Sequence, residues 1–353
     1  TATVRVLMGA PEDFDRDAWL RRYQRDWNAP DAVIDAAIRT ATGRGVVERT
    51  RLYIGEANET HVATVVGGRQ VLVKIAHGRP DSFANLARMS ALAGGAGVAV
   101  PEVLHAAIVD LEKGPSGLVV QTYLAGQPLV GSIADLAPGD IERFVVEAGR
   151  ILARLHAISL PDFDRTGGPA SSEVPRSFSE DILPMLVHGV LPRLEAAADH
   201  HGMLPRVREA RAVIEERAHE LDRWGPVVTH GDYGLDHLLV EGGRITGLID
   251  LDLAAASSPL RDIGWWDHYF DRPPHPSSLL IAGYRQVGEL PDDPAPRRLY
   301  AVVMSLATLD YFLSVDNPGG VEFSRRKLDG ALASRGPRSI ASGVRRGRTG
   351  RGS

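Results

Sequence analysis

The chain of 353 residues contains no cysteine. This excludes disulfide bridges, zinc sites built on thiolates and a cysteine nucleophile. The chain also lacks any apolar run close to the roughly 18–20 residues that a membrane-spanning helix needs, so the sequence predicts no such helix. Its first twenty residues lack the basic-then-apolar order of a secretory signal. We therefore expect a cytoplasmic protein that does not associate with a membrane.

Aromatic residues are also scarce, at 6%, but hydrophobic residues reach 44% and charged residues 24%, as in a packed soluble protein. The net charge of −5 is unevenly distributed, because six arginines and no acid follow residue 334. The rest of the chain, residues 1–334, is called the body here; it has 34 basic and 45 acidic residues and so carries a net charge of about −11. Such a body is a poor candidate for nucleic-acid binding, so we expect no nucleic-acid partner, and it suits a cationic ligand better, although a charge that serves only solubility explains it at least as well.

The N-terminal third of the chain predicts a small antiparallel sheet. Residues 11–44 have helical periodicity, which is broken at Pro30. Short runs of β-forming residues follow, and a helix is predicted at 82–92. The predicted strands are 46–53, 60–66, 70–75, 101–109 and 117–123.

From residue 124 onward the pattern becomes mostly helical. The predicted helices are 140–158 with Asp140 as N-cap, 181–200, 205–224, 276–290, 297–315 and 322–333. Residues 161–180 are predicted to form a loop, and 226–253 form a non-helical island. We therefore predict an α+β protein of two lobes. Its expected parts are an N-lobe (1–123) with an N-terminal helical extension, a hinge (124–138), a helical C-lobe (139–335) and a disordered basic tail (336–353).

The island contains the residues that suggest chemistry. Two apolar strands flank a polar loop that carries Asp232 and His237, and a third strand ends at Asp250. This order places the three side chains at the mouth of a small sheet. Phosphoryl transfer needs a carboxylate to orient or deprotonate the attacking hydroxyl, and further ligands for Mg²⁺ on the phosphates. A single aspartate here would be explained as a turn cap, but turn capping does not readily explain Asp232, His237 and Asp250 together at this spacing.

The spacing resembles that of the aminoglycoside phosphotransferase family, within the protein-kinase-like superfamily. That family carries His-Gly-Asp, four residues and an Asn, then Ile-Asp about a dozen residues later. This chain has Asp232 in the first motif, His237 in place of the Asn, and Asp250 in the last motif. Asp262 matches a downstream aspartate that braces the catalytic loop. The resemblance covers roughly residues 50–315 and implies a bilobal fold with a small antiparallel β N-lobe and a mostly helical C-lobe.

The resemblance implies a role for each residue of the island. Asp232 would be the catalytic base, Asp250 the Mg²⁺-binding aspartate and His237 the second residue of the metal loop. His230 and His156 would be structural. Macrolide phosphotransferases, as the resemblance suggests, also carry a His at the position of His237. Imidazole is a poorer Mg²⁺ ligand than an amide oxygen, so His237 could instead contact the metal through water, or one metal site could be weak.

The same resemblance implies a site for ATP or GTP in the N-lobe and the hinge. Gly55, Asn58 and Thr60 match a turn that covers the nucleotide phosphates, although the pattern also fits a plain hairpin turn. Gln121 and Tyr123 precede the hinge, whose backbone would bind adenine or guanine.

Lys74 is a charged residue inside an apolar strand, where lysine is seldom buried without a reason. In the kinase pattern this lysine pairs with the α- and β-phosphates and with a Glu on the next helix. The next predicted helix has no acid, so we expect Asn85, Asp81 or Glu59 to take that place.

We therefore predict an ATP- or GTP-dependent O-phosphotransferase acting on a hydroxyl of a small molecule. An amine-bearing antibiotic is the expected acceptor, with Asp267, Asp271 and Trp266 as candidate contacts. A metabolic kinase for choline, homoserine or a sugar is one alternative, and a nucleotide-binding pseudokinase scaffold is another. We expect a monomer or a weak dimer.

Overall fold

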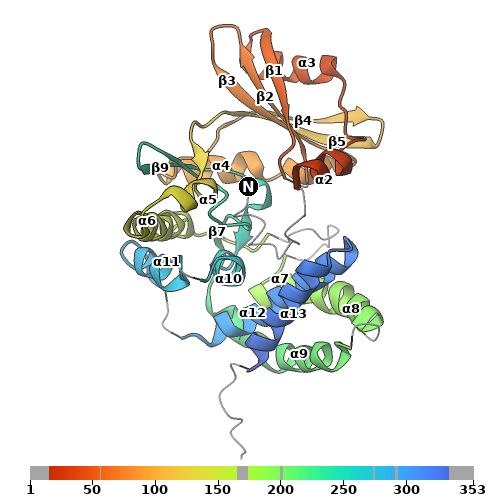
Figure 1. The fold of residues 1–353 in the computed structure, drawn as a ribbon, viewed down its shortest axis with the longest axis vertical. Coiled ribbons are helices and arrows are strands. Elements are labelled where there is room, and N and C mark those ends of the chain that lie inside the picture. The colour runs from red at the N-terminus through yellow and green to blue at the C-terminus, as the bar shows by residue number, and fades with distance from the viewer. Residues whose placement is uncertain are drawn as a thin grey trace, which may run out of the picture.

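The computed structural model of the chain describes residues 16–55, 57–164, 174–198, 202–272, 275–290 and 293–333, so the predicted tail at 336–353 lies outside them. A lobe built on a sheet lies above a larger helical lobe, and the chain passes between them near α5 (Leu129–Ser132) (Figure 1). This arrangement confirms the predicted α+β bilobal fold.

The N-lobe is an antiparallel sheet of five strands in the order β1-β2-β3-β5-β4. Its central strands are the most apolar, and Val71, Val73 and Ile75 of β3 have no exposed surface. Before β4 the chain forms a 3₁₀ turn at Pro80–Phe83 and α4 (Leu86–Gly95), which replace the predicted helix at 82–92. The strands are β1 (Val46–Leu52), β2 (Glu59–Val65), β3 (Gln70–Ala76), β4 (Val103–Leu111) and β5 (Gly114–Thr122).

Two helices precede the sheet, as the broken periodicity predicts. They are α2 (Arg16–Tyr23) and α3 (Asp31–Thr42), and Pro30 occupies the N-cap of α3. The apolar side of α3, which includes Ile34 and Ile38, packs into the same hydrophobic cluster as the strands. The described part of the N-terminal extension thus contributes α3 to the N-lobe core.

The C-lobe differs from its prediction in several places. A helix begins at Phe178, inside the predicted loop 161–180, and the helix predicted at 276–290 ends at Tyr284. The first long helix begins at Pro138, so Ala137 is its N-cap and Asp140 lies in its first turn. Pro184 lies inside the predicted helix 181–200, and a π-helical turn at Leu186–Val190 interrupts it. The helix α10 was not predicted. The helices are α6 (Pro138–His156), α7 (Phe178–Met185), α8 (Leu191–Ala198), α9 (Leu204–Arg217), α10 (Leu260–Tyr269), α11 (Ser277–Tyr284), α12 (Ala295–Ser314) and α13 (Pro318–Ala333).

The predicted island contributes strands to two small sheets next to the hinge. The strands β8 (Leu238–Glu241) and β9 (Arg244–Leu248) form the expected hairpin, and β6 (Gln127–Pro128) pairs with β8. The strands β7 (Val227–Thr229) and β10 (Ala255–Ser257) form the second sheet. The catalytic loop predicted from the sequence thus begins and ends on strands.

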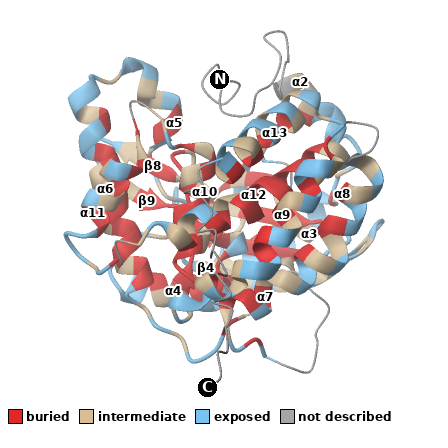
Figure 2. Ribbon diagram, turned by 90° about the horizontal axis from the view of Figure 1, so that it is seen from below, coloured by how far each residue is buried: buried red, intermediate tan, exposed pale blue. Residues whose placement is uncertain are grey.

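Buried residues run through the interior of both lobes (Figure 2). One hydrophobic cluster spans α4, α6, α10 and α11, and therefore joins the N-lobe to the C-lobe beside the island. No helix of the described part of the chain combines the length and the apolar character needed to cross a bilayer.

Candidate active site

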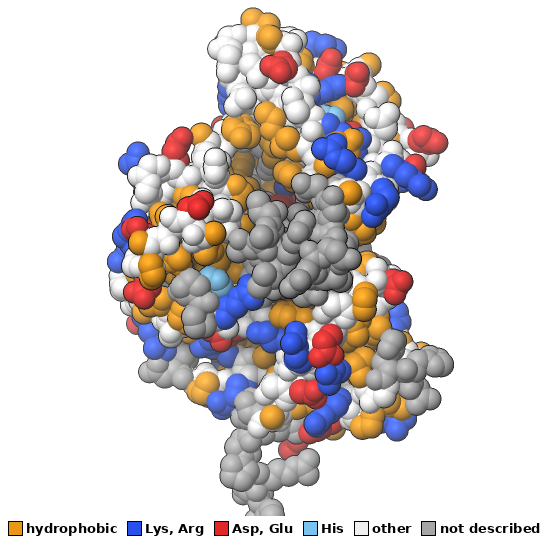
Figure 3. Space-filling view, viewed as in Figure 1, with side chains coloured by type: hydrophobic (Ala, Val, Ile, Leu, Met, Phe, Trp, Pro, Cys, Tyr) orange, Lys and Arg blue, Asp and Glu red, His pale blue; other side chains and the backbone are white. Residues whose placement is uncertain are grey.

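Three segments of the chain, one from the N-lobe and two from the C-lobe, meet where the lobes join. They are Lys74 on β3, the loop 230–237 between β7 and β8, and Asp250–Asp252 after β9. The face drawn in Figure 3 is hollowed between the lobes, and hydrophobic side chains gather around the hollow. The structure therefore brings together the Asp232, His237, Asp250 and Lys74 of the sequence prediction.

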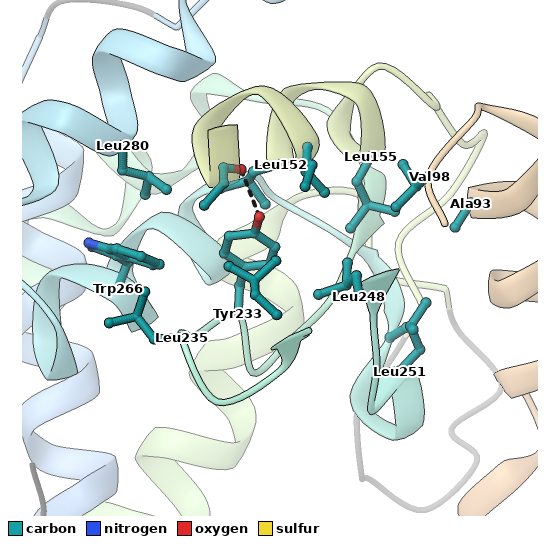
Figure 4. Close-up of a cluster of buried hydrophobic side chains, with 14 of the residues drawn as sticks. Ala93, Val98, Leu152, Leu155, Tyr233, Leu235, Leu248, Leu251, Trp266 and Leu280 are labelled. Carbon is teal, nitrogen blue, oxygen red and sulfur yellow. Dashed lines mark hydrogen bonds between the residues drawn. The ribbon is translucent and has the colours of Figure 1, made fainter. Parts of the chain in front are cut away.

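The loop 230–237 is anchored by its own apolar side chains. Tyr233 and Leu235 are fully buried and extend into the cluster drawn in Figure 4. The Tyr233 hydroxyl donates a 2.7 Å hydrogen bond to the carbonyl of Ala148 on α6. Asp232 and His237, in contrast, keep part of their side chains exposed. The loop thus anchors its apolar residues in the core and leaves its polar residues for chemistry.

The main chain of the loop is braced by Asp262 on α10, as the resemblance implies. Its carboxylate accepts hydrogen bonds from the N–H groups of His230 (2.8 Å) and Gly231 (2.6 Å), and from His156 Nε2 (3.0 Å). Although burial raises the pKa of Asp262, these hydrogen bonds hold it below its ordinary value. Gly231 has φ +86°, and a Cβ there would collide with the carbonyl of Leu253, so only glycine fits.

Asp232 is held through its backbone, which leaves its carboxylate available. Its N–H donates to His230 Nδ1 at 3.2 Å, and its carbonyl accepts from His237 Nδ1 at 2.7 Å. His230 Nε2 in turn donates to the carbonyl of Ile249, so His230 is the neutral tautomer, and burial lowers its pKa to about 4. Burial raises the pKa of Asp232 to about 6.

His237 lies among carboxylates. Its Nε2 is 3.5 Å from Oδ2 of Asp250 and 3.9 Å from Oδ2 of Asp236. Although burial lowers the pKa of His237, the carboxylates of Asp236, Asp232 and Asp250 raise it to about 9. In the absence of a bound cation, His237 is therefore an imidazolium at neutral pH.

The partner of Lys74 differs from the three candidates. Its Nζ donates to Asp250 at 2.6 Å and to both oxygens of Asp252 at 2.9 Å. Glu59 is instead bonded to His61 and His77. The expectation of Asn85, Asp81 or Glu59 is thus wrong for this structure, because the residue that replaces the missing helix Glu comes from the C-lobe.

Asp252 is the site residue to which the sequence assigned no role. Besides Lys74, it accepts a 2.8 Å hydrogen bond from Nδ2 of Asn58, which lies in the turn between β1 and β2. Burial raises the pKa of both aspartates of the pair, but Lys74 holds that of Asp250 below its ordinary value, while that of Asp252 stays raised. The two lobes are therefore tied together by charge and by hydrogen bonds. The sequence could have identified Asp252 as a site residue, because it lies two residues after Asp250.

The remaining residues predicted to bind the nucleotide lie on or just beyond strands of the N-lobe sheet. Thr60 is buried on β2 and pairs with Lys74 in the strand register, and Gln121 is buried at the end of β5. Tyr123, one residue beyond β5, is 40% exposed. Gly55 lies just after β1, in the left-handed region at φ +68°.

The three candidates for acceptor contacts are each engaged within the protein. Trp266 has no exposed surface and belongs to the hydrophobic core, so its prediction as an acceptor contact is wrong. Asp267 makes a two-pronged ion pair with Arg297, at 2.7 and 3.0 Å. Asp271 accepts from the N–H of Ser277 at the start of α11. The aromatic residues of α10 serve packing.

A five-stranded antiparallel lobe above a helical lobe, with a lysine, a catalytic loop and an aspartate at their junction, defines a protein-kinase-like fold. The model of the phosphotransferase enzyme family matches residues 50–300. The chain belongs to this family, and the resemblance seen in the sequence is confirmed.

Individual relatives are distant. Aminoglycoside 3'-phosphotransferase of Escherichia coli is 37% identical over 60 residues, which are 17% of this chain and 22% of that protein. The chain thus spans about a fifth of the length of that relative. Among solved structures, aminoglycoside phosphotransferase APH(4)-Ia is 18% identical with a TM-score of 0.64 over 87% of this chain and 100% of that one. Macrolide 2'-phosphotransferase MphH from Brachybacterium faecium is 20% identical with a TM-score of 0.53, over 85% and 97%.

Proposed function

We propose that this protein transfers the γ-phosphoryl group of ATP or GTP to a hydroxyl of a small molecule, and that the acceptor is an amine-bearing natural product such as an antibiotic. The observation that carries the proposal is the meeting of Lys74, Asp232 and Asp250 at the junction of the lobes. APH(4)-Ia has been solved in a ternary complex with AMP-PNP and hygromycin B, which supports a nucleotide and an antibiotic as co-substrates.

The residues at the junction fit a nucleotide that carries Mg²⁺. Asp250 bonds Lys74 through Oδ1, and its carboxylate is 41% exposed, so oxygen remains for a hard cation. No group of three or more His, Asp or Glu side chains in the described ranges is arranged to hold a metal alone, so the phosphates would supply further ligands. When bound, Mg²⁺ neutralises charge on the transferred group. Lys74 would turn from the aspartates to the α- and β-phosphates.

Asp232 is suited to act as the general base. Its carboxylate is 31% exposed, whereas its backbone is fixed by His230 and His237. A pKa near 6 leaves it mostly ionised at neutral pH and still able to accept a proton. As the acceptor oxygen bonds to the γ-phosphorus, its proton would pass to Asp232, and the bond to the β–γ bridging oxygen would break, releasing ADP or GDP.

The charge of the body supports the choice of acceptor. A body near −11 attracts an amine-bearing molecule and repels one that carries a carboxylate or a phosphate. In this proposal, residues 1–123 and the hinge at 124–138 bind the nucleotide, and residues 139–335 bind the acceptor.

Mass spectrometry of reaction products tests the proposal. The protein would be incubated with ATP or GTP, Mg²⁺ and a panel of macrolide, aminoglycoside, peptide and nucleoside antibiotics, with Asp232→Asn as the matched control. A phosphate added to an antibiotic by the wild type and not by the control supports the proposal. If only choline, homoserine or sugars are phosphorylated, the protein is a metabolic kinase. Nucleotide binding without any transfer would indicate a pseudokinase.

A further inference from the structure

The N-terminal segment reaches the nucleotide site although it precedes the family match at residues 50–300. Gln24, at the end of α2, is fully buried, and its Nε2 donates a 2.8 Å hydrogen bond to the carbonyl of Gly55. The carbonyl of Gln24 accepts from Arg51 on β1 at 3.1 Å. Gln24 is therefore fixed to β1 and, through its amide, to Gly55, the third residue after that strand.

The same segment also holds the other end of this turn. Glu59, the first residue of β2, has 1% of its side chain exposed, and it accepts from the N–H of Ala29 at 3.0 Å. His61 Nε2 at 2.8 Å and His77 Nε2 at 2.6 Å bond its two oxygens. The ring of Trp27 stacks on His77, with centroids 5.9 Å apart. The residues on both sides of the turn are thus bonded to the segment 24–29.

The turn has a third attachment, on the C-lobe. Asn58 donates to Asp252, which also binds Lys74. Gly55 lies at φ +68° with no heavy atom within 4 Å of a Cβ built there, so packing around this glycine does not fix the turn. Its position depends instead on the hydrogen bonds at Gly55, Asn58 and Glu59, together with those that Arg79 donates to the carbonyl of Ala57 and to Oδ1 of Asn58.

We propose that the segment 24–29 positions the phosphate-covering turn, and that Gln24 and Glu59 are positioning residues for nucleotide binding. This inference rests on the proposed function, because it takes the turn after β1 as the cover of the phosphates. A turn that is already held in place loses less conformational freedom when the nucleotide binds, which strengthens binding without altering the transfer step.

Gln24→Met tests the inference, because methionine keeps the length of the side chain and removes the donor. Gln24→Glu is the second variant, since it keeps the shape but sets an acceptor against the Gly55 carbonyl. The control is Asp35→Asn, which weakens the 3.0 Å ion pair between α3 and Arg49. Calorimetry with a non-hydrolysable ATP or GTP analogue and Mg²⁺ gives the Kd, steady-state turnover gives KM and kcat, and thermal melting gives the Tm.

We expect Gln24→Met to raise the nucleotide Kd and KM about two- to tenfold, the value of one hydrogen bond, with kcat within about twofold of the wild type. Gln24→Glu should raise them at least as much, and Asp35→Asn should not. Unchanged Kd in both Gln24 variants, or an equal rise in Asp35→Asn, overturns the inference and leaves the proposed function standing. A wild-type protein that binds neither analogue overturns both.

Hydrogen exchange on the unmodified chain provides a measurement that does not depend on the folding of any variant. Bound nucleotide should slow amide exchange in peptides that cover residues 24–29, because the turn and the segment are bonded to each other. Unchanged exchange there, in a protein that binds the analogue, overturns the inference.

Discussion

Replacing Asp262, which braces the loop 230–237, should lower both the stability of the fold and the rate of phosphoryl transfer. Asp262 has no exposed surface, and its carboxylate accepts three hydrogen bonds, two from backbone N–H groups and one from His156. In Asp262→Asn, one acceptor oxygen becomes an amide donor. At least one N–H, that of His230 or of Gly231, then faces a donor inside the core.

The size of the effect follows from these contacts. A hydrogen bond to a charged group contributes about 1.5–3 kcal/mol, and a buried group left without its partner costs about 1–3 kcal/mol. We therefore expect Asp262→Asn to lower the free energy of unfolding by about 2–4 kcal/mol. Since Gly231 precedes Asp232, the shift of the loop should also reduce kcat by about tenfold or more, because misplaced catalytic groups are costly.

Denaturant unfolding and steady-state turnover would measure both effects. Asp271→Asn is the matched control, because Asp271 is exposed and accepts one N–H, that of Ser277. Its cost should stay below about 1 kcal/mol, with kcat unchanged. If Asp262→Asn behaves like this control in both assays, the hydrogen bonds of the brace do not hold the loop, and the reasoning fails.

Three further predictions concern the residues at the junction of the lobes. Asp232→Asn should keep nucleotide affinity and lower kcat about 10²–10⁴-fold, the usual contribution of a general base, and near-wild-type turnover would exclude the mechanism. Asp250→Ala should abolish the Mg²⁺-dependent part of nucleotide affinity in calorimetry, whereas unchanged affinity would show that Asp250 is not a metal ligand. If a bound cation displaces the proton of the His237 imidazolium, His237→Asn should lower the ratio of activity with Mn²⁺ to activity with Mg²⁺, because Mn²⁺ accepts nitrogen ligands more readily; equal ratios would indicate that His237 stays protonated and acts through its charge alone.

The parts of the site that the sequence predicted are those formed by short segments. The loop around Asp232 and the strand ending at Asp250 are 18 residues apart and flank one hairpin, so local patterns place them together. The sheet was predictable for the same reason, because each of its strands has alternating or continuous apolar residues and recognisable turns.

The parts that the sequence did not predict depend on long-range packing. Asp252 reaches Lys74 across 178 residues, and its spacing from Asp250 does not by itself identify Lys74 as its partner. The helix α10 was missed because Gly264 lies inside it and glycine disfavours helices. The structure requires that glycine, since a Cβ there would collide with the ring of Tyr300 on α12. Trp266 was predicted to contact the acceptor molecule because the sequence does not show which side of an aromatic helix faces the core.

Lowering the pH into the mildly acid range should destabilise the fold through His268, which is not one of the site residues described above. His268 on α10 is 3% exposed, and burial lowers its pKa to about 3, with Lys327 acting in the same direction. The unfolded chain binds a proton at this residue below about pH 6.5, while the folded chain does not until about pH 3. Stability therefore falls as the pH drops through this window. At pH 5 the loss from His268 alone is about 2 kcal/mol.

Comparing the wild type with His268→Gln isolates this contribution, because all other titrating groups are shared. Gln keeps a polar group for Thr308, whose Oγ1 is 3.1 Å from His268 Nε2, but it does not titrate. The free energy of unfolding from urea titrations at pH 7 and pH 5 should decrease by about 2 kcal/mol more in the wild type than in the variant. Equal losses would mean that His268 is protonated in the folded protein as readily as in the unfolded chain, so burial on α10 would not exclude the charge.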